Sequence, residues 1–193
     1  MTVVRVTTIY RFVGLSSDTK PASGVPAGSE FYETDTGATY LTPDGGTTWV
    51  LKLAPVGFYR ATKTVTFTGA ANLGAVGAVP LFTVTGEVLI ERIVPFCTTN
   101  LGEAAPTATL ALGVTGSTLL LIAATNAVDI DANEFWVDTT PDANGIAVPA
   151  ALKDIAITDN IIGTVAAQAV NAGVLRVDVW WRPLSVTGNV VAA

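Results

Sequence analysis

The sequence predicts an all-β chain, and three observations support this fold class. Turn-forming glycine and proline residues recur about every dozen residues. The segments between them are rich in Val, Thr, Ile, Phe and Trp, which favour strands. Several segments also alternate with period two, most clearly VLRVDVWW at residues 174–181, where Leu175, Val177, Val179 and Trp181 share one face. We therefore expect a jelly-roll-like antiparallel β-sandwich of about eight strands, preceded by a small N-terminal β-meander.

Residues 1–53 are predicted to form a small attachment module. The stretch VTTIYRFVG opens it as an extended arm, and SSDTKPASGVPAGSE follows as a loop rich in Ser, Pro and Gly. FYET and ATYLT, joined by Asp-Thr-Gly, predict a hairpin whose glycine adopts the left-handed conformation. A second turn, Pro-Asp-Gly-Gly, leads to TTWVLKL, which completes a three-stranded meander.

Residues 54–193 are predicted to form the sandwich body, with the boundary at residues 54–57. The candidate strands are 57–69, 80–96, 107–114, 117–125, 133–139, 152–158, 160–170 and 174–185. The stretch from residue 160 to 173 is rich enough in alanine to suggest a helix instead. Gly163, Thr164 and its valines weigh against that alternative.

The amino-acid composition excludes most of the common catalytic residue arrangements. The chain of 193 residues contains no histidine, so it lacks the usual general base and the commonest transition-metal ligand. Cys97 is the single cysteine, which excludes an internal disulfide and a zinc-binding cysteine cluster. We expect a protein that is not an enzyme and that holds no cofactor and no metal.

Charge and hydropathy narrow the possible partners. The net charge is −6 and no run of Lys or Arg is present, so nucleic acid is not an expected partner. Arg5 and Arg11 stand inside the apolar positions of the first residues instead of ahead of them, unlike a secretory signal. Only 13% of residues are charged and the mean hydropathy is +0.51, so we expect the apolar surplus to be buried between copies of the chain.

A charge-free run at residues 104–128 is long enough for a membrane span, which needs about 20 residues. Pro106, Gly113 and Gly116 interrupt it, and its Thr-Gly-Ser centre is typical of a turn. The run therefore predicts two strands and no membrane helix.

Asp35 lies in Asp-Thr-Gly, the triplet that carries the catalytic aspartate of aspartic proteases. Those enzymes need two carboxylates so close that they share one proton, and this chain has one such triplet. A protease would therefore require a symmetric dimer, and Glu33 and Thr34 before the triplet suit a solvated strand better than a buried one. We expect the corner of a hairpin.

Asp129, Asp131 and Asn133 repeat the alternating oxygen ligands that begin a calcium-binding loop. The pattern then fails, because Glu134 stands where the loop needs glycine and Thr140 where it needs glutamate. A polar turn is the favoured interpretation, with a cation site of another kind as the alternative.

The first 53 residues hold many aromatic side chains for so short a piece. Three strands alone bury little surface, so some of these rings must meet another surface. They pack on each other or on the sandwich, or they dock on a partner. The candidate docking residues are Tyr10, Phe12, Phe31, Tyr32, Tyr40 and Trp49.

The segment SSDTKPASGVPAGSEFYETDTGATYLTPDGGTTWV resembles a short module of tailed-bacteriophage structural proteins, in which a Pro-x-Gly-like loop leads to a Phe/Tyr-Glu-Thr-Asp-Thr-Gly hairpin and a Trp-Val strand. The later stretches TGEVLIERIVPFCT, EFWVDTTPDA and VWWRPLS are similar to virion proteins of the head-fibre and capsid-decoration kind. The resemblance implies a virion component, commonly a homotrimer with a β-sandwich body. It also implies that the partners are further copies of the chain and the major capsid protein or another virion protein.

Three functions follow as expectations. The first is a decoration or head-fibre protein on the outer surface of the phage head, docked through residues 1–53. The second is a tail or baseplate component, or an adhesin whose sandwich binds host glycans on a platform of Trp136, Trp180 and Trp181; an exposed pair of these would favour it. The third, a depolymerase or aspartic protease, is the least favoured.

Overall fold

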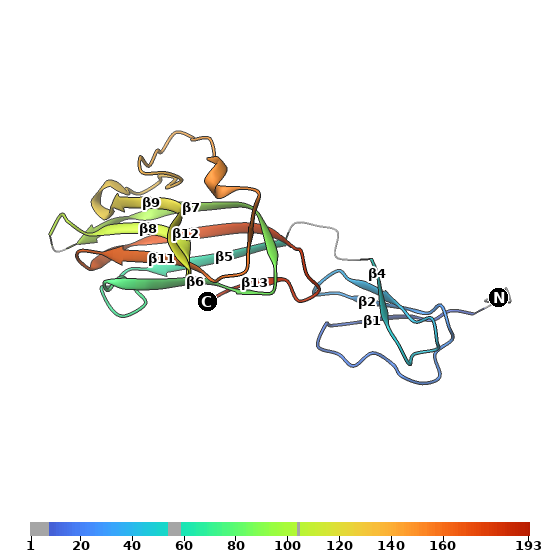
Figure 1. Ribbon diagram of the computed structural model, residues 1–193. Helices are drawn as coiled ribbons and strands as arrows, with labels where there is room; N and C mark the ends of the chain where they lie inside the picture. Colours follow the sequence, from blue (N-terminus) through green and yellow to red (C-terminus); the bar gives the residue numbers. More distant parts are fainter. Residues whose placement is uncertain (1–7, 54–58, 104) are drawn as a thin grey trace. The chain divides into compact units, whose positions relative to one another are not determined.

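The computed structural model describes residues 8–53, 59–103 and 105–193. The chain divides into two compact units, Met1–Gly57 and Phe58–Ala193 (Figure 1). The boundary predicted at residues 54–57 lies outside the described residues, as does the start of the predicted arm.

The N-terminal unit is a four-stranded sheet in the order β1-β2-β3-β4. Its strands are β1 (Arg11–Gly14), β2 (Glu30–Glu33), β3 (Thr39–Leu41) and β4 (Val50–Leu53). β2, β3 and β4 form the predicted antiparallel meander. β1 pairs with β2 in parallel, so the prediction of an extended arm is wrong for residues 11–14. A parallel pair needs a long connection, and the loop at residues 15–29 supplies it.

The second unit contains two sheets in which every described strand pair is antiparallel. One sheet has the order β10-β7-β12-β5 and the other β13-β6-β11-β8-β9. The strands are β5 (Tyr59–Thr66), β6 (Gly77–Thr85), β7 (Val88–Glu103), β8 (Thr109–Val114), β9 (Ser117–Asn126), β10 (Ile155–Ile157), β11 (Ile161–Ala166), β12 (Val170–Pro183) and β13 (Asn189–Ala192).

The predicted all-β class is confirmed, and the two sheets form a sandwich-like arrangement (Figure 1). Among the described strands, β8 and β9 are the one consecutive pair that shares a sheet; every other step from β5 to β13 changes sheet. The jelly roll stays a prediction, and the strand orders agree with it.

Two strand predictions for the sandwich are wrong in detail, and one strand was missed. The single strand predicted at 80–96 is two strands, because Gly86 at φ +63° turns the chain between β6 and β7. Residues 133–139 form no strand and are held by isolated bridges from Phe135 to Phe96 and to Asp142. β13 was not predicted. The alternative helix at 160–173 is not formed, since β11 and the start of β12 occupy it.

The core of the sandwich consists of side chains that alternate along the strands between a buried and an outward-facing side. Leu175, Val177, Val179 and Trp181 of β12 are all buried, as their shared face predicts. They belong to one continuous cluster of buried apolar side chains contributed by the strands of both sheets. Trp136, which is fully buried, joins this cluster from the segment that follows β9.

The charge-free run folds mainly as the hairpin of β8 and β9, with the turn at Thr115 and Gly116 as predicted. Within the described ranges, no helix is long and apolar enough to cross a membrane.

Candidate interaction surfaces

One face of the N-terminal sheet is closed by an aromatic cluster. Trp49 packs edge-on against Phe12 and Phe31, with ring centroids 6.2 and 6.1 Å apart, and Tyr10 meets Phe12 in the same way at 6.1 Å. The indole nitrogen of Trp49 donates to the carbonyl of Pro21 at 3.0 Å, which fastens the loop at residues 15–29 over the rings. The cluster acts as the small core of this unit.

Lys20 joins this cluster to a buried carboxylate. Its ammonium group lies 4.1 Å from the centre of the Tyr40 ring and 4.9 Å from that of Phe31, and it pairs with Glu33 at 2.7 Å. Glu33 is 3% exposed and also accepts from the Thr36 hydroxyl at 2.6 Å. Burial, followed by the negative charge of Glu33, raises the pKa of Tyr40. These contacts stabilise the unit internally and leave little of this face for a partner.

The opposite face of the same sheet is open. Val13, Tyr32 and Val50 are 69%, 44% and 51% exposed. Val13 and Tyr32 are neighbours across the β1–β2 pair, and Val50 stands opposite Leu41 on the next pair. Residues directly opposite each other share a face, so these side chains lie on one face of the sheet, which we call the open face.

Ion pairs lie on the open face, because Glu30 stands opposite Arg11 and Leu41 there. Glu30 pairs with Lys52 and lies 3.6 Å from the guanidinium of Arg11. The hydrogen bond from Lys52 is the main cause that lowers the pKa of Glu30. An apolar centre beside charged residues is the usual composition of a protein contact surface.

The six predicted docking residues therefore fall into two groups, four in the closed face and two at exposed positions. Phe31 is 4% exposed, and Phe12, Tyr40 and Trp49 are half-buried in the closed face. Tyr10 and Tyr32 are exposed, at 46% and 44%. Sequence reasoning missed Val13 and Val50 on the open face. The alternation within Glu-Phe-Tyr-Glu places Phe31 and Tyr32 on opposite sides of the sheet. This pattern could have shown that the two aromatic residues belong to different faces.

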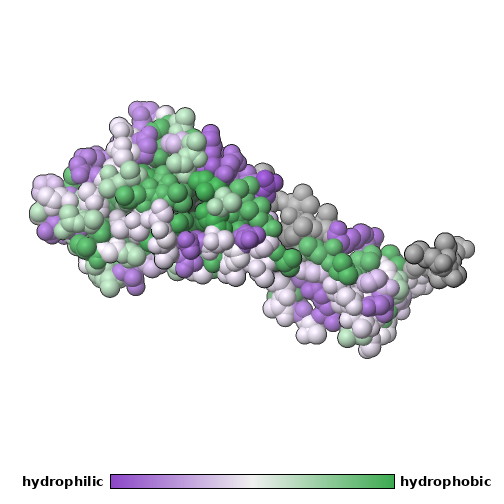
Figure 2. Space-filling model, in the orientation of Figure 1, coloured by the Kyte–Doolittle hydropathy of each residue, from purple (hydrophilic) through white to green (hydrophobic). Residues whose placement is uncertain are grey.

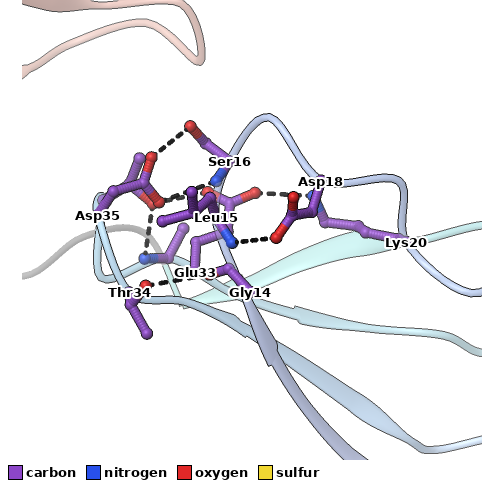
Figure 3. Close-up of polar contacts among 10 residues, drawn as sticks. Gly14, Leu15, Ser16, Asp18, Lys20, Glu33, Thr34 and Asp35 are labelled. Atoms are coloured by element: carbon purple, nitrogen blue, oxygen red, sulfur yellow. Dashed lines mark hydrogen bonds and ion pairs between the residues drawn. The ribbon is translucent and has the colours of Figure 1, made fainter.

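Asp35 caps the loop that follows β1 (Figure 3). Its carboxylate accepts from the Ser16 backbone nitrogen at 2.8 Å and from the Ser16 hydroxyl at 2.5 Å. The Ser16 hydroxyl is the main cause that lowers the pKa of Asp35. Gly37 turns the hairpin at φ +75°, as predicted. A carboxylate held ionised by these bonds is suited to tie two loops together, whereas a protease dyad must retain a proton.

Asp35→Asn should therefore act on the N-terminal unit alone. An amide donates where the carboxylate accepted, so we expect the unit to lose less than about 1 kcal/mol, because the contact is exposed. Hydrogen exchange of the Ser16 amide should quicken while the sandwich amides stay unchanged. Loss of a peptidase activity in this variant would contradict the hairpin role.

The outer face of the β10-β7-β12-β5 sheet carries a cluster of cations and aromatic rings. Trp180 lies between its cross-strand neighbours Arg60 and Arg92, whose guanidinium carbons are 5.2 and 4.6 Å from the ring centroid. A hollow of about 380 Å³ beside it is lined by Glu91, Arg92, Val148, Lys153 and Trp180. The guanidinium groups engage the indole by cation–π contact, which orders this face.

The three tryptophans proposed as a glycan platform do not form one. Trp136 is fully buried and Trp181 is 5% exposed, stacked on Tyr59 at 4.8 Å. Of the three, Trp180 alone is partly exposed. The exposed pair that would have favoured glycan binding is not formed by these residues.

Asp178 is the charged residue held most firmly in the sandwich. It is 4% exposed and accepts from Arg60 at 2.7 Å, from the Thr62 hydroxyl at 2.6 Å and from Arg176 at 3.0 Å. Burial by itself would raise the pKa of Asp178, but the hydrogen bonds from Thr62 and Arg60 and the nearby guanidinium charges outweigh it and lower the pKa. These partners explain why an aspartate stands within a strand.

The predicted polar turn at residues 129–133 is held by amide side chains. Asn100 donates to Asp131 at 2.7 Å and Asn126 donates to Asp129 at 3.2 Å. Asn133 has φ +68°, which fits a turn. No group of three or more Cys, Asp or Glu side chains within the described ranges is placed to hold a metal ion.

Cys97 is fully buried in the core. Burial is the main cause that raises the pKa of its thiol. A thiol in such surroundings is a poor nucleophile.

Comparison of the chain with protein-family models, with curated proteins and with solved structures gave no match.

Proposed function

We propose that this chain is a structural component of a tailed-bacteriophage particle, bound as a decoration or head-fibre protein to the outer surface of the head. It works as a homo-oligomer, with three copies as the expected number, and it catalyses no reaction. The N-terminal unit docks on the major capsid protein or another virion protein. The sandwich is the body exposed on the particle.

The open face is the observation that carries this proposal. It places exposed Val13, Tyr32 and Val50 on one face of a small unit whose aromatic cluster lies on the other side of the sheet. Apolar side chains gathered in this way mark a contact surface. The fold of the resembling segment supports the same interpretation, because its Phe-Tyr-Glu-Thr-Asp-Thr-Gly stretch forms the β2–β3 hairpin that presents Tyr32.

A tail or baseplate position is the alternative, because the module that the segment resembles is shared by head and tail proteins. Copy number separates the two positions. Quantitative mass spectrometry of purified particles should find hundreds of copies for a head-surface protein, and a few copies would move the proposal to the tail.

Tyr32→Asp combined with Val13→Asp should abolish binding of the full chain to particles that lack it. Two carboxylates in the centre of an apolar contact must be desolvated without partners, so we expect at least about 100-fold weaker binding. Co-sedimentation of the purified chain with such particles measures this.

Ser23→Asp is the matched control, since Ser23 is exposed on the loop at residues 15–29. It adds charge to the same unit away from the open face and should bind like the unchanged chain. Full binding by the Tyr32 and Val13 double variant would show that the N-terminal unit does not dock through this face.

A further inference from the structure

The two sheets of the sandwich differ completely in charge. β5, β7 and β12 together carry the charged residues Arg60, Lys63, Glu91, Arg92, Glu103, Arg176, Asp178 and Arg182. The five strands of the β13-β6-β11-β8-β9 sheet, all of them described, contain no Asp, Glu, Lys or Arg. Ion pairs and cation–π contacts engage most of the charges of the first sheet within the sandwich itself.

The uncharged sheet turns small, apolar and hydroxyl side chains outward. On β6, Ala78 and Thr83 are exposed between core residues, and on β11 Ile162 and Thr164 are half-buried. Figure 2 shows hydrophobic residues gathered on the visible face of the sandwich, with hydrophilic residues mainly along its margins. A surface of this kind loses little on leaving water, because no charge has to be desolvated.

The β9 edge of this sheet also lacks charged residues. β9 is an edge strand, and its Leu119 and Leu120 are 57% and 43% exposed. Edge strands of monomeric proteins are normally guarded by charged residues or proline that prevent pairing with another chain. β9 contains neither.

A hollow adjoins this edge. It has a volume of about 360 Å³, and its apolar lining includes Val114, Leu120, Ala156 and Leu184, together with the carboxylates Glu87 and Asp159. Val186, two residues beyond Leu184, is 89% exposed. Each copy of the chain thus offers an apolar recess and exposed apolar side chains that could fill it. Head-to-tail contacts of that kind form a ring when the rotation between copies closes and an open filament when it does not.

We infer that the uncharged sheet and its β9 edge form the surface through which copies of this chain associate with each other. The net charge of −6 makes two copies repel one another, and this sheet is where they approach with no strand charge between them. The inference deepens the proposed function and rests on its expectation of a homo-oligomer, for which it names the interface.

Thr83→Glu and, separately, Thr83→Lys test the inference in the full chain. Thr83 is exposed on β6, so either substitution should leave the fold intact, as thermal unfolding at low concentration can verify. Sedimentation equilibrium should show the unchanged chain as an oligomer and both variants as the 19.9 kDa monomer, with the dissociation constant raised about 100-fold. The two variants introduce charges of opposite sign. If both dissociate the oligomer, the cause is burial of a charge; if Thr83→Glu alone does so, the cause is repulsion between acidic copies.

Thr64→Glu is the matched control, because Thr64 is an exposed threonine at an interior position of β5 in the charged sheet. It should sediment like the unchanged chain. Oligomers that persist in both Thr83 variants would overturn the assignment of the interface, and an unchanged chain that is monomeric at all concentrations would overturn self-association itself. Particle binding is measured independently, so either result can occur while docking on the particle stands; a monomeric chain would remove only the homo-oligomer from the proposed function.

Discussion

Replacing Trp136 with alanine should lower the free energy of unfolding of the sandwich by about 3 to 5 kcal/mol. The indole is fully buried, and the residue is held to the chain by its backbone nitrogen, which donates to the carbonyl of Pro95 at 3.1 Å. Its ring nitrogen donates to the hydroxyl of Thr125, 3.0 Å away and itself 3% exposed. Truncation therefore leaves a large cavity and removes a buried hydrogen bond at once.

Denaturant unfolding followed by circular dichroism measures this loss. Since domains of this size are stable by about 5 to 15 kcal/mol, the variant should unfold at a much lower denaturant concentration. Trp180→Ala is the matched control, because it removes the same side chain from a partly exposed position with cation–π contacts worth about 0.5 to 1 kcal/mol each. Equal losses for the two variants would mean that Trp136 is not part of the core.

Replacing Asp178 with asparagine should cost about 3 kcal/mol. The amide keeps the size of the side chain but turns a donor toward Arg176, whose nitrogen also donates at this position. It also leaves the guanidinium groups of Arg60 and Arg176 without their shared counter-charge. Asp159→Asn, at an exposed position between β10 and β11, is the control and should change stability much less.

The pH dependence of stability provides a second measurement on Asp178. Its pKa is lower in the folded chain than the ordinary aspartate value of about 3.9. The unfolded chain therefore binds the proton first, and the contribution of Asp178 is fully present above about pH 4 and is lost as the pH falls through the folded-state pKa. The asparagine variant should lack this part of the acid destabilisation. An acid limb identical to that of the unchanged chain would show that Asp178 does not contribute to it.

Local signals predicted much of the fold. The alternation in β12 identified its buried face, and the turn residues located the β2–β3 and β8–β9 hairpins. The errors arose where distant residues decide the structure. Residues 133–139 alternate like a strand, yet Phe135 finds only isolated bridges to Phe96 and Asp142. β1 looked like a free arm because its parallel partner lies beyond a long loop.

The candidate surfaces were only partly predictable for the same reason. The density of aromatic residues pointed to the N-terminal unit, but composition cannot tell which side of a short strand is covered. Lys20 and Trp49 close one face of the sheet from outside β2, and this leaves Tyr32 exposed and Phe31 buried. The division of charge between the two sheets was not predicted either, because most consecutive strands change sheet and the sequence does not tell which strands pair.

That alternation also governs when the sandwich can form during synthesis. Among the described strands, β5 has β12 as its one sheet neighbour, and Tyr59 pairs with Trp181. A nascent chain therefore leaves the ribosome with β5 and β6 unpaired until almost the last strand has been translated, while the N-terminal sheet can close early from its own residues. We therefore expect the body to fold late and slowly, since its strands pair over long distances in the sequence.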